Sequence, residues 1–77
     1  MKVTREQAVA DVADALFLDA EDVDHELDLE EQGLDSVRLM QLVDRWRDSG
    51  AKGIDFIALA EDRRLSRWLK ILDDIQT

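Results

Sequence analysis

Residues 33–46, which read Gly-Leu-Asp-Ser-Val-Arg-Leu-Met-Gln-Leu-Val-Asp-Arg-Trp, contain the signals that decide the fold. Asp35 is a good N-cap because its carboxylate can accept hydrogen bonds from the N–H groups two and three residues further on. Apolar residues then recur at helical spacing until Ser49 and Gly50: Val37, Leu39, Met40, Leu42, Val43 and Trp46. The stretch therefore predicts an amphipathic helix with Ser36 as its first residue.

A second helix is predicted over residues 4–17, before this stretch. The spacing of Thr4 and Gln7 fits a capping box, in which the hydroxyl accepts from one N–H group and the glutamine reaches back to another. An apolar stripe at helical spacing follows, formed by Val9, Val12, Ala13 and Leu16 and widened by Ala8 and Ala15.

Two more helices are predicted after Gly53. Residues 54–60 are expected to form a brief buried helix capped by Asp55. The last helix has one apolar face, formed by Leu65, Trp68, Leu69, Leu72 and Ile75. No alternating strand pattern is found, so we expect an all-α fold, a four-helix bundle with a short third helix, in a single domain over residues 1–77.

The segment over residues 18–35 has no sustained period and predicts a long loop between the first two helices. Isolated apolar side chains are expected to hold it against the core: Leu18, Val23, Leu27, Leu29 and Leu34. A connection this long in a compact domain is usually functional.

The composition excludes several classes of function. A chain of 77 residues buries only about 60% of its surface, which leaves little room for a deep active site. Without cysteine it has no disulfide framework, Cys-based zinc site or catalytic thiol. The net charge is −9, with twelve acidic residues and no lysine or arginine between Glu6 and Val37. Basic protein partners are therefore expected, and no nucleic acid or membrane. The N-terminus has no apolar signal core, which predicts a cytoplasmic protein, and Met1 and the short tail Gln76-Thr77 fit a free-standing one.

Ser36 has the most unusual chemical setting in the chain. Its hydroxyl is expected to be exposed at a helix N-terminus, where the helix field favours a phosphate. Two interpretations are equally open, a serine modified by a phosphate-containing group and a serine that merely starts the helix. An α/β-hydrolase nucleophile is excluded because Leu34 and Arg38 stand where that motif needs glycines. His25 has no second His or Cys near it at the spacing of metal ligands, and the acidic residues fit no EF-hand register. No metal site is therefore predicted.

Gly33-Leu34-Asp35-Ser36, followed by Val37-Arg38-Leu39-Met40, resembles the phosphopantetheine attachment motif of acyl and peptidyl carrier proteins. The longer pattern, which adds Trp46-Arg47, Ile54-Asp55-Phe56, Leu59-Ala60 and Trp68, resembles the aryl carrier proteins of nonribosomal siderophore assembly. The resemblance covers residues 4–75. Two departures affect local geometry and not the attachment site: Lys52-Gly53 lengthens a turn, and residues 62–66 replace a Pro-Thr-containing entry to the last helix.

The resemblance implies a monomeric carrier with no catalysis of its own. A phosphopantetheinyl transferase would join 4'-phosphopantetheine covalently to Ser36, which Leu34 and Asp35 flank. The thiol of that group would hold an aryl acid, of the salicylate or 2,3-dihydroxybenzoate type, as a thioester. An aryl-acid adenylating enzyme would load it, and the condensation domain of a nonribosomal peptide synthetase would receive it.

The resemblance also implies which residues contact those partners: Val37, Arg38, Met40, Phe56 and Ala60. Core packing is the alternative, because apolar residues at helical spacing mostly lie inside. The two interpretations are equal for Phe56 and Ala60, whereas Met40 favours an exposed contact because it lies one turn beyond Ser36. Trp46 and Trp68 are expected to be structural, and the surface acids Asp44 and Asp48 to pair with Arg45 and Arg47.

Two alternatives to the aryl carrier stay open. A carrier of a fatty, polyketide or aminoacyl group would use the same Ser36 with other loading enzymes. A helical adaptor without a prosthetic group would bind a basic partner through the acidic segment.

Overall fold

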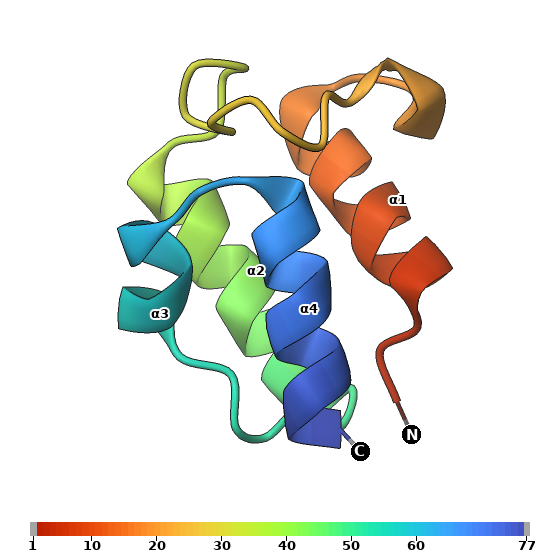
Figure 1. The fold of residues 1–77 in the computed structure, drawn as a ribbon, viewed down its shortest axis with the longest axis vertical. Coiled ribbons are helices and arrows are strands. Elements are labelled where there is room, and N and C mark those ends of the chain that lie inside the picture. Colours follow the sequence, from red (N-terminus) through yellow and green to blue (C-terminus); the bar gives the residue numbers. More distant parts are fainter. Residues whose placement is uncertain (1, 77) are drawn as a thin grey trace.

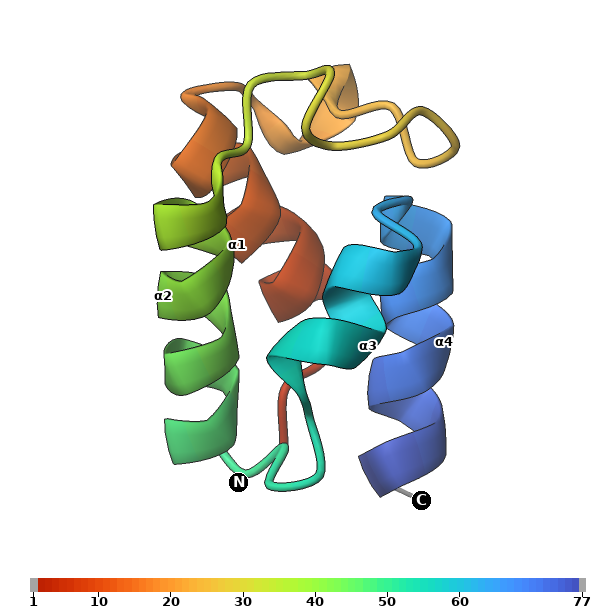
Figure 2. The ribbon, with the colours of Figure 1, turned by 90° about the vertical axis from the view of Figure 1, so that its left-hand side faces the viewer.

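Four α-helices and one short 3₁₀ helix form the fold in the computed structural model, which describes residues 2–76. The elements are α1 (Arg5–Leu16), the 3₁₀ helix η1 (Ala20–Asp22), α2 (Ser36–Asp48), α3 (Phe56–Glu61) and α4 (Leu65–Gln76). Figures 1 and 2 show the long connection from α1 to α2 crossing one end of the bundle, while the two ends of the chain lie at the other. The predicted all-α bundle with a short third helix is confirmed, and no strand occurs among the described residues.

The helices begin at the residues that the cap signals predict. Thr4 Oγ1 accepts from Gln7 N at 3.0 Å, Asp35 Oδ1 from Arg38 N at 2.8 Å, and Asp55 Oδ1 from Ile57 N at 2.8 Å. These bonds satisfy N–H groups that have no partner within a helix. The capping box is only half correct, because the Gln7 side-chain amide donates forward to Asp11 Oδ1 at 2.9 Å.

The core is built around two tryptophans, as predicted. Trp46 and Trp68 are fully buried and meet edge to face, with ring centroids 6.2 Å apart. Both indole N–H groups have acceptors: Trp46 donates to Asp11 Oδ2 at 3.0 Å and Trp68 to the carbonyls of Leu59 and Asp62. The largest buried aliphatic side chains are Leu29, Ile54, Leu59, Leu65 and Val12.

Three of the five predicted apolar contacts hold the long connection against the core. Val23, Leu29 and Leu34 are buried, whereas Leu18 and Leu27 are exposed, which corrects the prediction. The Gln32 amide donates to the carbonyls of Asp24 and Leu27 and folds this part of the chain into a compact turn with Leu27 outside. The sequence also gave no signal for η1.

Backbone hydrogen bonds tie the same connection to the start of α4. Leu29 N donates to Arg63 O at 2.8 Å, and Ser66 N donates to His25 O at 3.0 Å. These bonds hold the segment that leads into Ser36. Within residues 2–76, no helix is long and apolar enough to cross a membrane.

Candidate functional site

Ser36 lies on the surface as the first residue of α2, at the end of the bundle that the long connection crosses. Its hydroxyl makes no hydrogen bond with the residues that the structure describes. Asp35, the N-cap, binds the N–H group of Arg38 and leaves the Ser36 hydroxyl unengaged. An exposed hydroxyl at the positive end of a 13-residue helix suits attachment of a phosphate-containing group.

Buried neighbours fix the position of this serine. Leu34 and Leu39 are each 3% exposed, and Leu34 N donates to Leu29 O at 3.0 Å. Gly33 has a φ of 115°, a backbone conformation that residues with a side chain rarely adopt, and it turns the chain into the helix. Leu34, predicted to flank an attached group, thus has its side chain in the core, where it anchors the turn before Ser36.

A hollow of about 10 Å³ lies beside Ser36, lined by residues that include Glu30, Leu39 and Arg63. That volume holds roughly one water molecule. A group attached to Ser36 would not fit into this hollow. The exposed hydroxyl, the open surface and the helix N-terminus all fit a phosphopantetheine group.

The predicted contact residues separate by exposure. Val37 is 66% exposed and Met40 is 53% exposed, so both are available to a partner. Phe56 and Ala60 are partly buried and pack against the core, which favours the core interpretation for these two. Ile57 is 65% exposed, and Leu59 is the only buried residue of α3, which corrects the prediction of a buried helix over residues 54–60. Residues 56–61 are too short to define a helical face by periodicity, so the sequence held no clear signal for Ile57.

Arg38, the remaining predicted contact, is half-buried. Its guanidinium carbon lies 4.7 Å from the centroid of the Phe17 ring, a cation–π distance. Phe17 is the C-cap of α1, so this pair joins the end of α1 to the first turn of α2.

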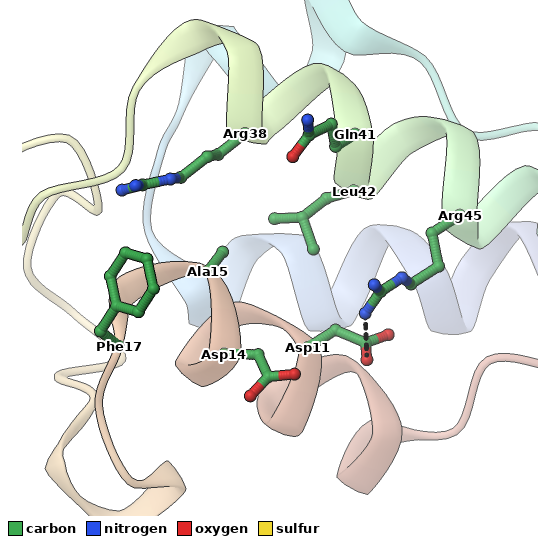
Figure 3. A pocket seen from close by; sticks show the side chains of 8 residues that line it. All are labelled: Asp11, Asp14, Ala15, Phe17, Arg38, Gln41, Leu42 and Arg45. Atoms are coloured by element: carbon green, nitrogen blue, oxygen red, sulfur yellow. Dashed lines mark hydrogen bonds and ion pairs between the residues drawn. The ribbon is translucent and has the colours of Figure 1, made fainter.

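Asp11 is a second residue that the sequence analysis missed. Its carboxylate is buried and accepts from Gln7 Nε2, Arg45 Nη1 and Trp46 Nε1. The predicted pairing of Arg45 and Arg47 with surface acids is wrong: Arg45 binds Asp11 (Figure 3), and Arg47 Nε donates to Ile54 O at 2.9 Å. The bonds of Asp11 connect α1 to α2 and fix the helix that begins with Ser36.

The turn between α3 and α4, where the sequence departs from the family pattern, is held by charge. Arg64 donates two side-chain hydrogen bonds to Asp62, at 2.9 and 2.7 Å. These bonds lower the pKa of the Asp62 carboxyl to about 2 and raise the pKa of Arg64. Among residues 2–76, no group of three or more His, Cys, Asp or Glu side chains could hold a metal ion.

Comparison with known proteins gives a family match over most of the chain. Residues 6–72 match the family model described as the phosphopantetheine attachment site. The chain is 43% identical over 61 residues to an isochorismatase of Bacillus subtilis (strain 168), covering 79% of this chain and 19% of that protein. It is 40% identical over 63 residues to the acyl carrier protein ScoB of Streptomyces coeruleorubidus, covering 82% of this chain and 73% of that protein.

A third similar protein is the phenyloxazoline synthase MbtB of Mycobacterium sp. (strain MCS), 36% identical over 73 residues, which cover 94% of this chain and 6% of that protein. The chain thus spans about a fifth of the isochorismatase and a small part of the synthase. No solved structure matches the chain.

Proposed function

This chain belongs to the family of phosphopantetheine attachment domains, and we propose that it is a carrier protein that bears the group on Ser36. The observation that carries the proposal is the exposed, unengaged Ser36 hydroxyl at the N-terminus of α2, within Gly33-Leu34-Asp35-Ser36. When bound, the group supplies a thiol that holds an acyl group as a thioester. The chain itself has no cysteine, so it needs that thiol from outside.

The acyl group that we propose is an aryl acid of the salicylate or 2,3-dihydroxybenzoate type. The pattern that continues through Ile54-Asp55-Phe56 and Trp68 supports this class. The name of one similar protein, phenyloxazoline synthase, refers to a phenyl group, which is an aromatic ring. The likeness to a protein named acyl carrier protein supports a second candidate, a carrier of a non-aromatic acyl group.

In the proposed cycle the chain performs no catalysis. Its partners are a phosphopantetheinyl transferase, an aryl-acid adenylating enzyme and the condensation domain of a nonribosomal peptide synthetase in siderophore synthesis. The exposed apolar side chains of Val37, Met40 and Ile57 lie on α2 and α3 and offer contacts to such enzymes. Asp35 caps the N-terminus of α2 by accepting a hydrogen bond from Arg38 N, and the buried side chain of Leu34 anchors the preceding turn.

A loading assay tests the proposed acyl group. The phosphopantetheinylated protein is incubated with adenylating enzymes of different specificity and their labelled acids, and label on the protein is measured. We expect label from salicylate or 2,3-dihydroxybenzoate, and none on the Ser36→Ala variant. Loading with fatty or aminoacyl groups but with no aryl acid would refute the aryl assignment and leave the carrier assignment intact.

The contact residues are tested in the same assay. Met40→Asp and Ile57→Asp introduce a charge at exposed positions, so the fold should persist while loading slows. Ile75→Asp is the matched control, because Ile75 is also partly exposed but lies near the end of α4. If Met40→Asp and Ile57→Asp are loaded as fast as Ile75→Asp and the wild type, Met40 and Ile57 are excluded from the interface with the loading enzyme.

A further inference from the structure

Two glutamines bind the backbone in the same way, at opposite ends of the bundle (Figure 1). Gln32 Oε1 accepts from Asp24 N at 3.0 Å, and Gln32 Nε2 donates to the carbonyls of Asp24 and Leu27, each at 2.9 Å. Gln76 Oε1 accepts from Val3 N at 2.7 Å, and its Nε2 donates to Val3 O at 2.9 Å and to a carbonyl one turn earlier in α4 at 3.1 Å. Each side-chain amide thus pairs with both polar groups of one residue, as a residue of a neighbouring strand would.

Gln32 joins two turns of the long connection. Its backbone belongs to the turn that leads into Ser36, because Gln32 N and Leu34 N both donate to Leu29 O, at 3.1 and 3.0 Å. Its side chain binds the preceding turn, and no other hydrogen bond joins residues 24–27 to residues 29–32 in the part of the chain that the structure describes. Without this amide each turn would be held separately, through its own contacts with residues 63–66.

The same amide fixes the backbone of Leu27. Leu27 N donates to Asp24 Oδ1 at 3.1 Å and Leu27 O accepts from Gln32 Nε2, so side chains bind both polar backbone groups of this residue. The Leu27 side chain is 43% exposed and is the one exposed apolar group among residues 24–32. An apolar side chain on a backbone that is already ordered loses little freedom on binding, which makes it a preorganised contact.

The connection lies where an enzyme that modifies Ser36 has to bind. It crosses the end of the bundle at which α2 starts (Figures 1 and 2). A standard protein interface covers about 800 Å² on each partner, so a round footprint centred on Ser36 has a radius of about 16 Å. Gln32 precedes Ser36 by four residues, which span at most about 14 Å of extended chain. The footprint therefore reaches the connection.

We propose that Gln32 is a positioning residue for the attachment of phosphopantetheine, whose amide holds the connection in the shape that the transferase binds, with Leu27 as an apolar contact. This role rests on the proposed function, because it takes Ser36 as the modified residue. In the reaction, Ser36 Oγ forms a bond to the phosphorus of the phosphopantetheine half of coenzyme A. The pyrophosphate bond breaks, the nucleotide half leaves, and the serine proton passes to the transferase. Gln32 takes no part in these bond changes.

Loss of the amide should therefore affect binding and not the chemical step. In Gln32→Met, which keeps the length of the side chain but has no N–H to donate, residues 24–28 sample several shapes. The apparent KM of the transferase for the carrier rises by the inverse of the fraction in the competent shape. Each lost hydrogen bond contributes a factor of about two or more, so we expect KM to rise by about threefold to tenfold. The start of α2 keeps its cap at Asp35, so kcat should not change.

Gln76→Met is the matched control. It removes the same set of three hydrogen bonds at the far end of the bundle, so it should lower stability to a similar degree and leave both kinetic constants unchanged. The constants are measured from the mass of the carrier during reaction with coenzyme A and Mg²⁺, at a temperature at which both variants are folded. Leu27→Ala should also raise KM. Combined with Gln32→Met it should raise KM by less than the product of the single effects, because Gln32 acts through Leu27.

The order of the free protein provides a measurement without the transferase. Backbone nitrogen relaxation should give order parameters of about 0.85 for residues 24–28 in the wild type and in Gln76→Met, and below about 0.6 in Gln32→Met. Those of α2 should stay the same in all three proteins.

The opposite outcomes are defined in advance. Unchanged order parameters or an unchanged KM in Gln32→Met, an equal rise of KM in Gln76→Met, or a fall in kcat at constant KM would overturn the role of Gln32 while the carrier function stands. Effects of Gln32→Met and Leu27→Ala that multiply in full would overturn the role of Leu27. Failure of the transferase to modify Ser36 in the wild type would overturn the proposed function and this inference with it.

Discussion

Replacing Asp11 by alanine tests the link between α1 and α2 that holds the helix that starts at Ser36. Asp11 is only 5% exposed. Its Oδ2 accepts from the buried Trp46 Nε1 at 3.0 Å, and its Oδ1 accepts from Gln7 Nε2 at 2.9 Å and Arg45 Nη1 at 3.1 Å. The carboxylate thus satisfies the one polar group of a fully buried tryptophan.

The expected loss follows from which donors can reach water. The Trp46 N–H stays buried without an acceptor in the variant, which costs about 1–3 kcal/mol. Arg45 and Gln7 are exposed and rehydrate, so losing their bonds adds less than about 1 kcal/mol. We expect the free energy of unfolding to fall by about 2–3 kcal/mol. That is a large share of the total for 77 residues, about 4–12 kcal/mol.

Urea unfolding followed by tryptophan fluorescence measures this loss. Asp14→Ala, which removes an exposed acid from the same helix, is the control and should change stability by less than about 0.5 kcal/mol. In a Trp46→Phe background the replacement of Asp11 should cost at least about 1 kcal/mol less, because no indole N–H is left unsatisfied. A loss below about 1 kcal/mol for Asp11→Ala alone would refute the reasoning.

Three further predictions concern the ends of the helices. Asp35→Ala removes the acceptor for Arg38 N and should lower stability by about 1 kcal/mol in urea unfolding, whereas Asp35→Asn should lose little. Phe17→Asn should leave the thermal midpoint unchanged or higher, because relief of left-handed strain, about 1 kcal/mol, offsets the lost cation–π contact; a clear fall would show that the ring is structural. The pKa of Asp62 is lowered from 3.8 to about 2 by Arg64, so its contribution to stability is present above pH 4 and is lost as the pH falls toward 2. Acid titration of stability should show this loss in the wild type and not in Asp62→Asn.

Local signals predicted the helices well, because each was encoded within one turn or one apolar stripe. Thr4, Asp35 and Asp55 cap the helices expected of them. Trp46 and Trp68 are buried because they lie on the apolar faces of their helices and because large aromatic side chains supply much of the buried area of a small core.

Features that depend on residues far apart in the chain were not predictable from pattern. Asp11 is buried because Trp46, 35 positions later, donates to it, and nothing in the local sequence of α1 shows this donor. Leu27 is exposed because Gln32 bonds to the carbonyls around it and sets the shape of the turn. The cation–π contact of Phe17 likewise forms only where the end of α1 meets Arg38.

The central claim is that Ser36 carries phosphopantetheine, and intact-mass measurement after incubation with coenzyme A, Mg²⁺ and a broad-specificity transferase tests it most directly. Ser66→Ala is the matched control, because Ser66 also lies at the start of a helix. The account predicts that the wild type and Ser66→Ala each gain the mass of one phosphopantetheine group and that Ser36→Ala gains none. No gain in the wild type, or a gain that persists in Ser36→Ala, would contradict it.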